Sequence, residues 1–511
     1  MQKGSSSGNA DILALGFGTS VAMWAMAYIL RLPAVGAPAS LTTAVLCITL
    51  LLGGYFAGRY TRRGWIGGLW TGLLSGGLNM LIVSSAISDH FKPTSSETIL
   101  PAEFGMFTLA ALAISAALCI FGAAFGNTRR ARQAELPNWT AVLSKVAVAA
   151  TLILIVAGGL VTSYSAGMAV PDWPSSFGHN MFLLPLSSVD PFLGEGNESE
   201  TEKLLDLAVK QGVVSATSGS DGVMAYGVAD FNLGGYTDLY LDKPSMLKML
   251  NDEPAYTAQL ASQVHMAVFL EHSHRLWGTL VGLVILVLAI HLSLSPASRV
   301  LRITAWVAFV LVCIQGALGG LRVLQNLDWA GAVHGVMAQI IFGIVAGIAV
   351  VTSTIWASTN ITKRYPAAST DRTLPLILLF VLILQAAIGA QMRHTDNADL
   401  LMLHIGIGCL ALGLAIFTGV RAWGLHPDVR PIKRRGTGLM HIAGIQLLLG
   451  FAAWGMGAPQ ETTPSIAQAL LSTMHQANGA LLVAGAVGVL LWNRKVLLPE
   501  VKGQGQSRIA S

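Results

Sequence analysis

Charged side chains are scarce in this sequence of 511 residues. Asp, Glu, Lys and Arg make up only 11% of it, whereas 53% of the residues are hydrophobic and the mean hydropathy is +0.61. Because soluble domains carry about 25% charged residues, the composition excludes a soluble globular protein and indicates a membrane protein. The excess of Lys and Arg over Asp and Glu, 31 against 26, is small and typical of cytosolic membrane loops. It predicts no nucleic acid partner.

Cysteine is rare as well. The four cysteines all lie inside apolar runs, and no two of them form a Cys-x-x-Cys pair. They are Cys47, Cys119, Cys313 and Cys409. This distribution excludes a disulfide framework and a zinc site, so we predict ordinary packing roles for all four.

Long apolar runs are abundant. A run of about 20 apolar residues can cross the hydrocarbon core of a lipid bilayer as a helix, and about twelve runs of this kind follow one another. They cover roughly 11–30, 40–58, 65–88, 104–127, 142–163, 264–292, 303–320, 332–357, 374–391, 400–420, 438–457 and 469–492. The sequence therefore predicts an all-α polytopic membrane protein.

Lys and Arg gather in alternate loops between these runs. The loops concerned carry Arg59, Arg62, Arg63, Arg129, Arg130, Arg132, Arg299, Arg302, Lys363, Arg364, Arg372, Arg430, Lys433, Arg434, Arg435, Arg494 and Lys495. By the positive-inside rule they face the cytosol, which places both termini there, in agreement with an even number of spans. The N-terminus is not rich in Arg, which argues against a mitochondrial transit peptide. We therefore expect a multi-pass protein of the bacterial plasma (inner) membrane.

The spans form three groups, followed by a tail. Residues 1–135 are predicted to form an N-terminal four-span segment of unknown function, and 493–511 a cytosolic tail. Two four-helix halves are predicted between them, at 142–357 and 374–492.

A long acidic insert interrupts the first half on its outer side, at residues 163–263. Within it, 201–211 has the pattern of a short amphipathic helix. A small cap outside the membrane and a solvated loop are both compatible with this composition.

Four of the histidines share one position within their spans. His274, His334, His404 and His475 each lie near the start of a span that runs inward, so their imidazoles are expected at one depth. Two imidazoles from facing helices can ligate one haem iron. The four residues therefore predict two haem sites, with a proton relay or a metal-ion pathway as the alternative.

A Gln-x-x-x-Gly pattern precedes three of these histidine-bearing spans. It occupies Gln315–Gly319, Gln385–Gly389 and Gln446–Gly450. Small residues in membrane helices allow close packing, so one such pattern means little. Its recurrence indicates an internal duplication in which the two halves are parallel repeats.

Glu271 lies three residues before His274, on the same helix face. A carboxylate within an apolar span is costly, so it is expected to face the interior of the bundle, where it could transfer protons. The alternative is a structural ion pair with Arg275 or Arg322. His272 points to another face and is predicted to be a bystander.

Several short motifs carry a family resemblance. They are Val170-Pro171-Asp172-Trp173-Pro174, Glu271-His272-Ser273-His274-Arg275, Gly320-Leu321-Arg322-Val323, Arg393-His394-Thr395 and His475-Gln476-Ala477-Asn478-Gly479-Ala480. In combination they resemble the haem A synthase family over about 142–492. The first two motifs are specific only when they occur together.

The resemblance implies an oxidoreductase of the monooxygenase or oxidase type. It would oxidise a methyl group of haem O to a formyl group and give haem A for terminal oxidases, with haem b as cofactor. Carried over to this sequence, Glu271 would be the catalytic carboxylate, His274 and His334 would ligate the iron of the substrate haem, and His404 and His475 that of the cofactor haem. Haem O synthase and cytochrome oxidase assembly factors would be partners.

Arg322 and Arg393 are candidates for contacts with the haem propionates. Each lies at the outer end of a span, one in each half, at the level of the histidines. An Arg side chain can bind a carboxylate through two parallel hydrogen bonds. An interfacial anchor is the alternative role.

The sequence departs from the family pattern in the first outer loop. Many members carry a cysteine pair there, whereas here Pro174 is followed by Ser175 and Ser176. A thiol step is therefore not expected in this protein. The second half lacks a copy of the Pro-Asp-Trp-Pro motif.

Two other functions remain open. A di-haem b-type electron-transfer protein would place its haems near opposite membrane faces, whereas the four histidines are predicted at one level. A haem transporter would distribute polar residues through the full membrane depth, and the inner parts of these spans are almost wholly apolar. Both arguments favour the enzyme.

Overall fold

The computed structural model describes most of the chain. The described residues are 9–90, 102–131, 136–178, 180–183, 199–211, 213–218, 223–230, 235–393, 398–456 and 464–499. Part of the acidic insert, His394 and Thr395, and the predicted tail beyond residue 499 lie outside this set. Statements about absence below refer to the described residues.

Helices dominate the described structure, because a backbone in hydrocarbon must satisfy its own hydrogen bonds. Eleven helices are long and apolar enough to cross a membrane. Their full bounds are α1 (Ala10–Arg31), α2 (Ala39–Tyr60), α4 (Ala102–Thr128), α5 (Trp139–Ser163), α8 (Pro254–Leu294), α9 (Arg299–Gln325), α10 (Asp328–Val351), α12 (Ala368–Met392), α13 (Ala398–Gly424), α14 (Arg430–Gly455) and α15 (Ile466–Val496). The remaining predicted span, 65–88, lies on α3 (Trp65–His90). The prediction of an all-α polytopic membrane protein is confirmed.

The chain divides into two compact units, which we describe separately. The first comprises Met1–Ala297, Gly319–Asn326 and Met456–Thr473, and the second comprises Ser298–Leu318, Leu327–Gly455 and Met474–Ser511. Helices α9 and α15 thus contribute to both units. The predicted division into an N-terminal segment and two halves stays a prediction.

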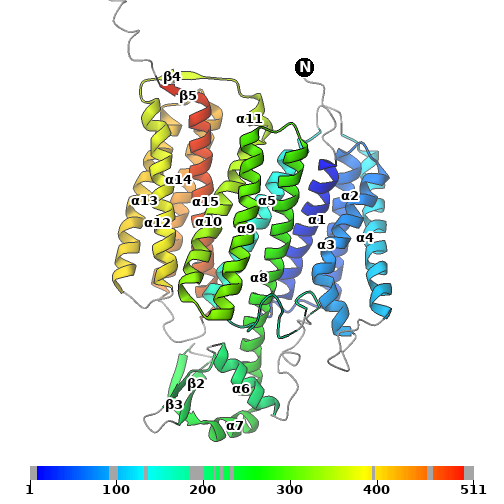
Figure 1. The fold of residues 1–511 in the computed structure, drawn as a ribbon, viewed down its shortest axis with the longest axis vertical. Coiled ribbons are helices and arrows are strands. Elements are labelled where there is room, and N and C mark those ends of the chain that lie inside the picture. Colours follow the sequence, from blue (N-terminus) through cyan, green and yellow to red (C-terminus); the bar gives the residue numbers. More distant parts are fainter. Residues whose placement is uncertain are drawn as a thin grey trace, which may run out of the picture. The chain divides into compact units, whose positions relative to one another are not determined.

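In the first unit, α1 joins the N-terminal helices to α5 and α8 (Figure 1). Trp24 of α1 meets Trp277 of α8 edge to face, with ring centres 5.6 Å apart, and Tyr28 stacks on Phe269 at 5.8 Å. Helices α2 and α4 approach so closely that a Cβ atom on Gly54 would lie 2.1 Å from a backbone oxygen of α4. The N-terminal helices therefore pack on one another, and α1 makes most of their contacts with α5 and α8.

The acidic insert forms a small α/β cap in its described part. It contains α6 (Glu200–Lys210), β1 (Ala216–Ser218), β2 (Met224–Asp230), β3 (Gly235–Asp242) and α7 (Lys243–Asp252). The strands form an antiparallel sheet in the order β1-β2-β3. The predicted amphipathic helix at 201–211 is confirmed as α6, whose N-terminal N–H of Glu202 is capped by the Ser199 hydroxyl.

The cap is continuous with the core of the first unit. Leu205 of α6 and Met246 of α7 are fully buried in the same cluster as Val170 and Val264. Helix α8 has 41 residues, about 60 Å at 1.5 Å per residue, whereas the hydrocarbon core is about 30 Å thick. Its N-terminal part therefore extends beyond the membrane and carries the cap (Figure 1).

The second unit is built around α12, α13, α14 and α15. Leu378, Leu439 and Val489 are buried in its apolar core. Near the N-terminal end of α12, the buried carboxylate of Asp371 pairs with Arg421 at 2.6 Å and with His426 at 3.0 Å. The short helix α11 (Thr354–Ser358) leads to β4 (Lys363–Tyr365), which pairs in parallel with β5 (Leu497–Pro499). These contacts tie the ends of the helices together and fix the level of the residues further along them.

Candidate functional site

The turn of α8 that carries Glu271 and Arg275 contacts the loop that follows α5 and contains the Pro-Asp-Trp-Pro motif. We call this loop the first outer loop. Glu271 is only 4% exposed, and its Oε2 accepts the N–H of Val170 at 2.8 Å. Its Oε1 pairs with Nη2 of Arg275 at 2.5 Å. The structural ion pair with Arg275, one of the two alternatives for this carboxylate, is therefore formed.

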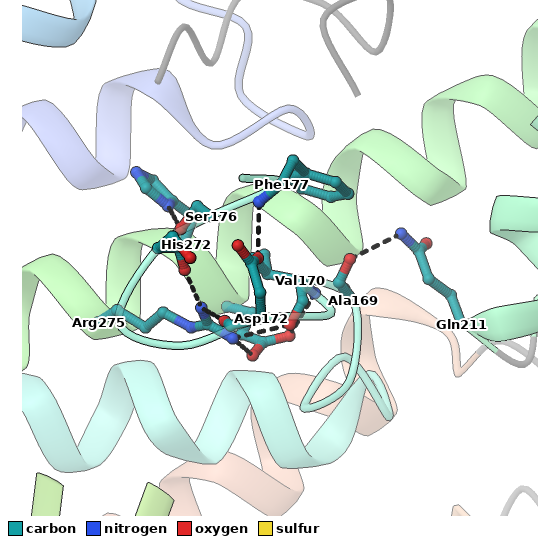
Figure 2. Close-up of polar contacts among 10 residues, drawn as sticks. Ala169, Val170, Asp172, Ser176, Phe177, Gln211, His272 and Arg275 are labelled. Atoms are coloured by element: carbon teal, nitrogen blue, oxygen red, sulfur yellow. Dashed lines mark hydrogen bonds and ion pairs between the residues drawn. The ribbon is translucent and has the colours of Figure 1, made fainter. Parts of the chain in front are cut away.

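Arg275 also donates to three backbone carbonyl groups of the loop. Its guanidinium contacts the oxygens of Val170 at 2.8 Å, Asp172 at 2.5 Å and Ser175 at 3.2 Å (Figure 2). A guanidinium has five N–H donors in a rigid plane, so one side chain can hold several carbonyls at once. The Pro-Asp-Trp-Pro motif is thus fastened to the same helical turn that carries Glu271.

Asp172 closes the loop on itself. Its Oδ1 accepts the N–H of Phe177 at 2.6 Å and its Oδ2 that of Gly178 at 2.8 Å. Partial burial raises the pKa of Asp172, but hydrogen bonds from Ser175, Gly178 and Phe177 and the charge of Arg275 outweigh it, so the pKa lies below its usual value. The ionised carboxylate is therefore the form that stabilises the loop.

This pKa gives a pH prediction for the loop. Because the folded pKa is lowered, the contribution of Asp172 is complete above the unfolded pKa of about 3.9 and is lost as pH falls through the folded value. We expect hydrogen–deuterium exchange protection of residues 170–178 to be the same at pH 5 and pH 7. Asp172→Asn should reduce this protection at both values, whereas Asp252→Asn, an exposed carboxylate at the end of α7, should not. Loss of protection already at pH 5 in the unchanged protein would contradict the assignment.

Two glycines let the outer loop approach its neighbours. A Cβ atom on Gly320 of α9 would lie 2.5 Å from Cδ2 of Trp173, so the indole rests directly on the helix backbone. A Cβ atom on Gly167 would lie 3.1 Å from Nη1 of Arg322. Arg322, a predicted propionate contact, is therefore placed against the first outer loop.

His272 has a contact that the sequence did not suggest. Its Nδ1 lies 3.2 Å from the hydroxyl oxygen of Ser176, and both residues are fully buried (Figure 2). Ser176 belongs to the serine pair, Ser175 and Ser176, that follows Pro174. His272 was predicted to be a bystander, and it is instead a further attachment point for the loop. The two residues are 96 positions apart in the chain, so no local sequence pattern reveals this pair.

Three of the four predicted haem-ligand histidines lie against a glycine of another helix. His274 of α8 contacts α5, His404 of α13 contacts α12, and His475 of α15 contacts α14. A Cβ atom would lie 2.9 Å from Cε1 of His274 if added to Gly158, 2.8 Å from Cε1 of His404 if added to Gly389, and 3.1 Å from Cε1 of His475 if added to Gly450. Real Cβ atoms are essentially never found closer than 3.0 Å, and a distance of 3.0–3.4 Å is tighter than nine in ten real Cβ contacts. Gly389 and Gly450 are the glycines of two Gln-x-x-x-Gly patterns, so in these two patterns the glycine leaves space for an imidazole ring.

The glutamine of the pattern has a second, equally local role. Nε2 of Gln315 donates to the backbone oxygen of His334 at 2.8 Å, and Nε2 of Gln385 donates to that of His404, also at 2.8 Å. Both pairs are 19 residues apart in the chain. The same contact therefore occurs between the third and fourth spans of the first predicted half and between the first and second spans of the second half.

The second unit brings His404 and His475 together. Their ring centres are 6.3 Å apart and their planes make an angle of 66°. Two imidazole nitrogens bound to opposite sides of one metal ion at about 2.0 Å each are about 4 Å apart, and each ring centre lies about 1 Å beyond its nitrogen, so ring centres about 6 Å apart are expected. The pair therefore fits a shared metal ion.

The surroundings of this pair also fit a haem. Nδ1 of His404 is buried and has no hydrogen-bond partner within the described residues. Arg393, the other predicted propionate contact, follows the last residue of α12, the helix whose Gly389 lies against the His404 ring. His274 belongs to the first compact unit and His334 to the second, so this pair and its shared iron stay a prediction.

These features define a class of protein: a polytopic helical membrane protein with two facing imidazoles and an outer loop fastened beside a buried carboxylate. Residues 249–398 match the model of a family described as cytochrome oxidase assembly protein (COX15-CtaA). The match confirms the resemblance to the haem A synthase family over these residues. Neither a curated protein nor a solved structure matches the chain.

The matched segment contains most of the predicted first-half site. It includes Glu271, His274, Arg322 and His334, together with Arg393 of the second predicted half. His404, His475 and the outer-loop motif around Asp172 lie outside the match. For these residues the geometry above is the independent argument.

Proposed function

We propose that this chain is a haem A synthase, which oxidises a methyl group of haem O to a formyl group and so supplies haem A to terminal oxidases. The observation that carries the proposal is the family match over 249–398, because it includes the turn with Glu271 and His274. Haem O is then a substrate held within the bilayer, and the chain is an oxidoreductase of the monooxygenase or oxidase type.

The substrate side of the proposal uses the first outer loop and α8. His274 and His334 would hold the iron of haem O, and Arg322 would bind a propionate. Glu271 would accept a proton released from the methyl carbon, while the electrons of the broken C–H bond pass to an external oxidant such as dioxygen. Its contacts with Arg275 and the Val170 N–H orient the two carboxylate oxygens, and a fixed orientation is what a proton acceptor needs.

The cofactor side uses the second unit. His404 and His475 would hold haem b, and Arg393 would bind one of its propionates. When bound, this haem supplies one-electron transfer. The protein contributes position: Gly389 and Gly450 admit the two rings, and Gln385 fixes the backbone of α13 at His404.

We also propose the bacterial plasma membrane as location, with both termini in the cytosol and the acidic cap outside.

Gln211 of the cap donates to the backbone oxygen of Ala169, next to the loop that binds Glu271 (Figure 2). Haem O synthase and cytochrome oxidase assembly factors would be the partners, since one makes the substrate and the others use the product.

A b-type electron-transfer protein is the second candidate function. It is favoured by one observation, namely that both oxygens of Glu271 already have partners in Arg275 and Val170. If Glu271 only anchored the loop, it would not take part in catalysis. The chain would then bind haem without converting haem O to haem A.

Co-expression separates the two candidates. The full chain is produced together with a haem O synthase in a host that lacks haem A, and the extracted haems are identified by chromatography and mass spectrometry. Haem A is expected only when both proteins are present. A stable b-type haem with haem O left unchanged would overturn the enzyme and favour the electron carrier.

A further inference from the structure

A short chain of hydrogen bonds ends at the ring of His475. Nδ2 of Asn478 donates to the backbone oxygen of Ile442 at 3.0 Å and to Oε1 of Gln446 at 2.7 Å. Nε2 of Gln446 in turn lies 3.2 Å from both ring nitrogens of His475. All four residues lie on α14 and α15 within the second unit. We call Gln446 and Asn478 the amide pair.

The orientation of the amide pair follows from the chemistry of its partners. A backbone carbonyl only accepts, so the nitrogen of Asn478 must face Ile442. The same nitrogen then requires the oxygen of Gln446, which turns the Gln446 NH2 group toward His475. A neutral imidazole always has one nitrogen with a free lone pair, so this NH2 group finds an acceptor in either tautomer.

His404 has no equivalent support. The amide nitrogen of Gln385 donates to the His404 backbone rather than to its ring. Oε1 of Gln385 and Nδ1 of His404 are both buried without a hydrogen-bond partner in the described part of the chain. Three residues after His404 stands Ile407, whereas Asn478 stands three residues after His475. The two rings are therefore held by different means.

Iron ligation would change the His475 ring from a hydrogen-bond acceptor for Gln446 to a hydrogen-bond donor. A metal ion takes the lone pair of one ring nitrogen, and the other nitrogen then carries an N–H, which needs an acceptor. Gln446 could supply that acceptor only by turning its carbonyl oxygen to the ring. Because Ile442 fixes Asn478, this rotation breaks the hydrogen bond between Asn478 and Gln446.

We propose that the amide pair is a two-position switch for His475, a role that rests on the proposed haem site at His404 and His475. Gln446 is a positioning residue in both positions: it donates to the haem-free ring and accepts from the haem-bound ring. Asn478 favours the donating position and so opposes haem binding. The pair therefore sets how tightly the second unit holds its haem.

The switch predicts effects of opposite sign for its two members. Gln446→Leu removes the acceptor of the bound ring, and loss of such a partner typically weakens metal binding by 10- to 100-fold. Asn478→Ala frees Gln446 to rotate, and one hydrogen bond less to break corresponds to about fivefold tighter binding. A role that is merely structural would weaken binding in both variants.

Titration of the purified haem-free full chain with haem b, followed by absorption, tests these signs. The expected order of affinity is Asn478→Ala, then the unchanged chain, then Gln446→Leu. If Asn478→Ala binds haem more weakly than the unchanged chain, or if Gln446→Leu binds equally well, the switch is overturned.

A second measurement does not depend on haem. In the haem-free chain labelled with 15N-histidine, Gln446→Leu and Asn478→Ala should both shift the ring signals of His475, identified as the signals lost in His475→Gln. Thr373→Val, a control at an exposed position of α12 whose hydroxyl donates to the backbone oxygen of Ser369 in the same helix, should leave them unchanged. Unshifted His475 signals in Gln446→Leu would contradict the amide pair itself. If the unchanged chain binds no haem while these shifts occur, the proposed function and the switch both fail. The contact between Gln446 and His475 is then retained as a structural contact.

Discussion

Replacement of Glu271 by Gln is expected to lower the rate of haem A formation by about 10²- to 10⁴-fold, the usual contribution of a group that moves a proton in the transition state. Gln has nearly the same volume and its side-chain oxygen can still accept the N–H of Val170. It cannot take a proton from the substrate methyl group. The rate is measured as haem A formed per chain in membranes that also contain a haem O synthase.

Glu253→Gln is the matched control for this variant. Glu253 lies at the N-terminal boundary of the same helix, α8, and is exposed, so haem A formation should be unchanged. Hydrogen–deuterium exchange separates proton transfer from loop anchoring. Loss of haem A with unchanged protection of residues 170–178 supports proton transfer, whereas loss of both would assign Glu271 to the loop. A full rate in Glu271→Gln would remove the carboxylate from the mechanism.

Replacement of His475 or His404 by Ala is expected to abolish binding of the cofactor haem. The rings are 6.3 Å apart and fit one shared iron, so neither imidazole alone supplies both axial ligands. The haem content of the purified chain, measured as the pyridine complex, should fall by about one haem per chain, and haem A formation should cease with it.

His441→Ala is the control for the histidine variants. His441 is an exposed histidine of α14, the helix that carries Gln446, and its Nδ1 contacts the backbone oxygen of Thr437 rather than another helix. Its replacement should leave the haem content unchanged. If His475→Ala retains the full haem content, the second-unit pair is not the cofactor site.

The membrane fold could be read from the sequence because its cause is local. Each span is a run of apolar residues long enough to cross the bilayer, so the positions of α1 to α5, of α8 to α10 and of α12 to α15 follow from composition alone. The cap is different. Its strands β1, β2 and β3 are short, and its core joins Leu205 and Met246 to residues of the outer loop and of α8, which no local pattern reveals.

Within the candidate site, the spacing of side chains along one helix was predictable and contacts between helices were not. The i,i+4 spacing of Glu271 and Arg275 allowed an ion pair, and that pair is formed. The pairing of His404 with His475 rests on the family resemblance; their ring centres lie 6.3 Å apart, and their ligation of one haem stays a prediction. The pairing of His274 with His334 stays a prediction.

The hydrogen bonds that position the site residues could not be predicted from the sequence, because they too join residues of different segments. Ser176 and His272 are separated by 96 positions, and Gln446 and Asn478 by 32. The Gln-x-x-x-Gly pattern was visible, yet only the structure shows that its glycine admits a ring and its glutamine binds a histidine. A recurring polar residue one turn before a recurring glycine was the available signal.

The central claim is tested most directly by incubating the purified chain with haem O, a reductant and oxygen, and recording the mass of the recovered haem. The account predicts a product in which one methyl group has become a formyl group, formed by the unchanged chain and by Glu253→Gln but not by Glu271→Gln. Recovery of haem O alone, from a chain that holds its b-type haem, would contradict it.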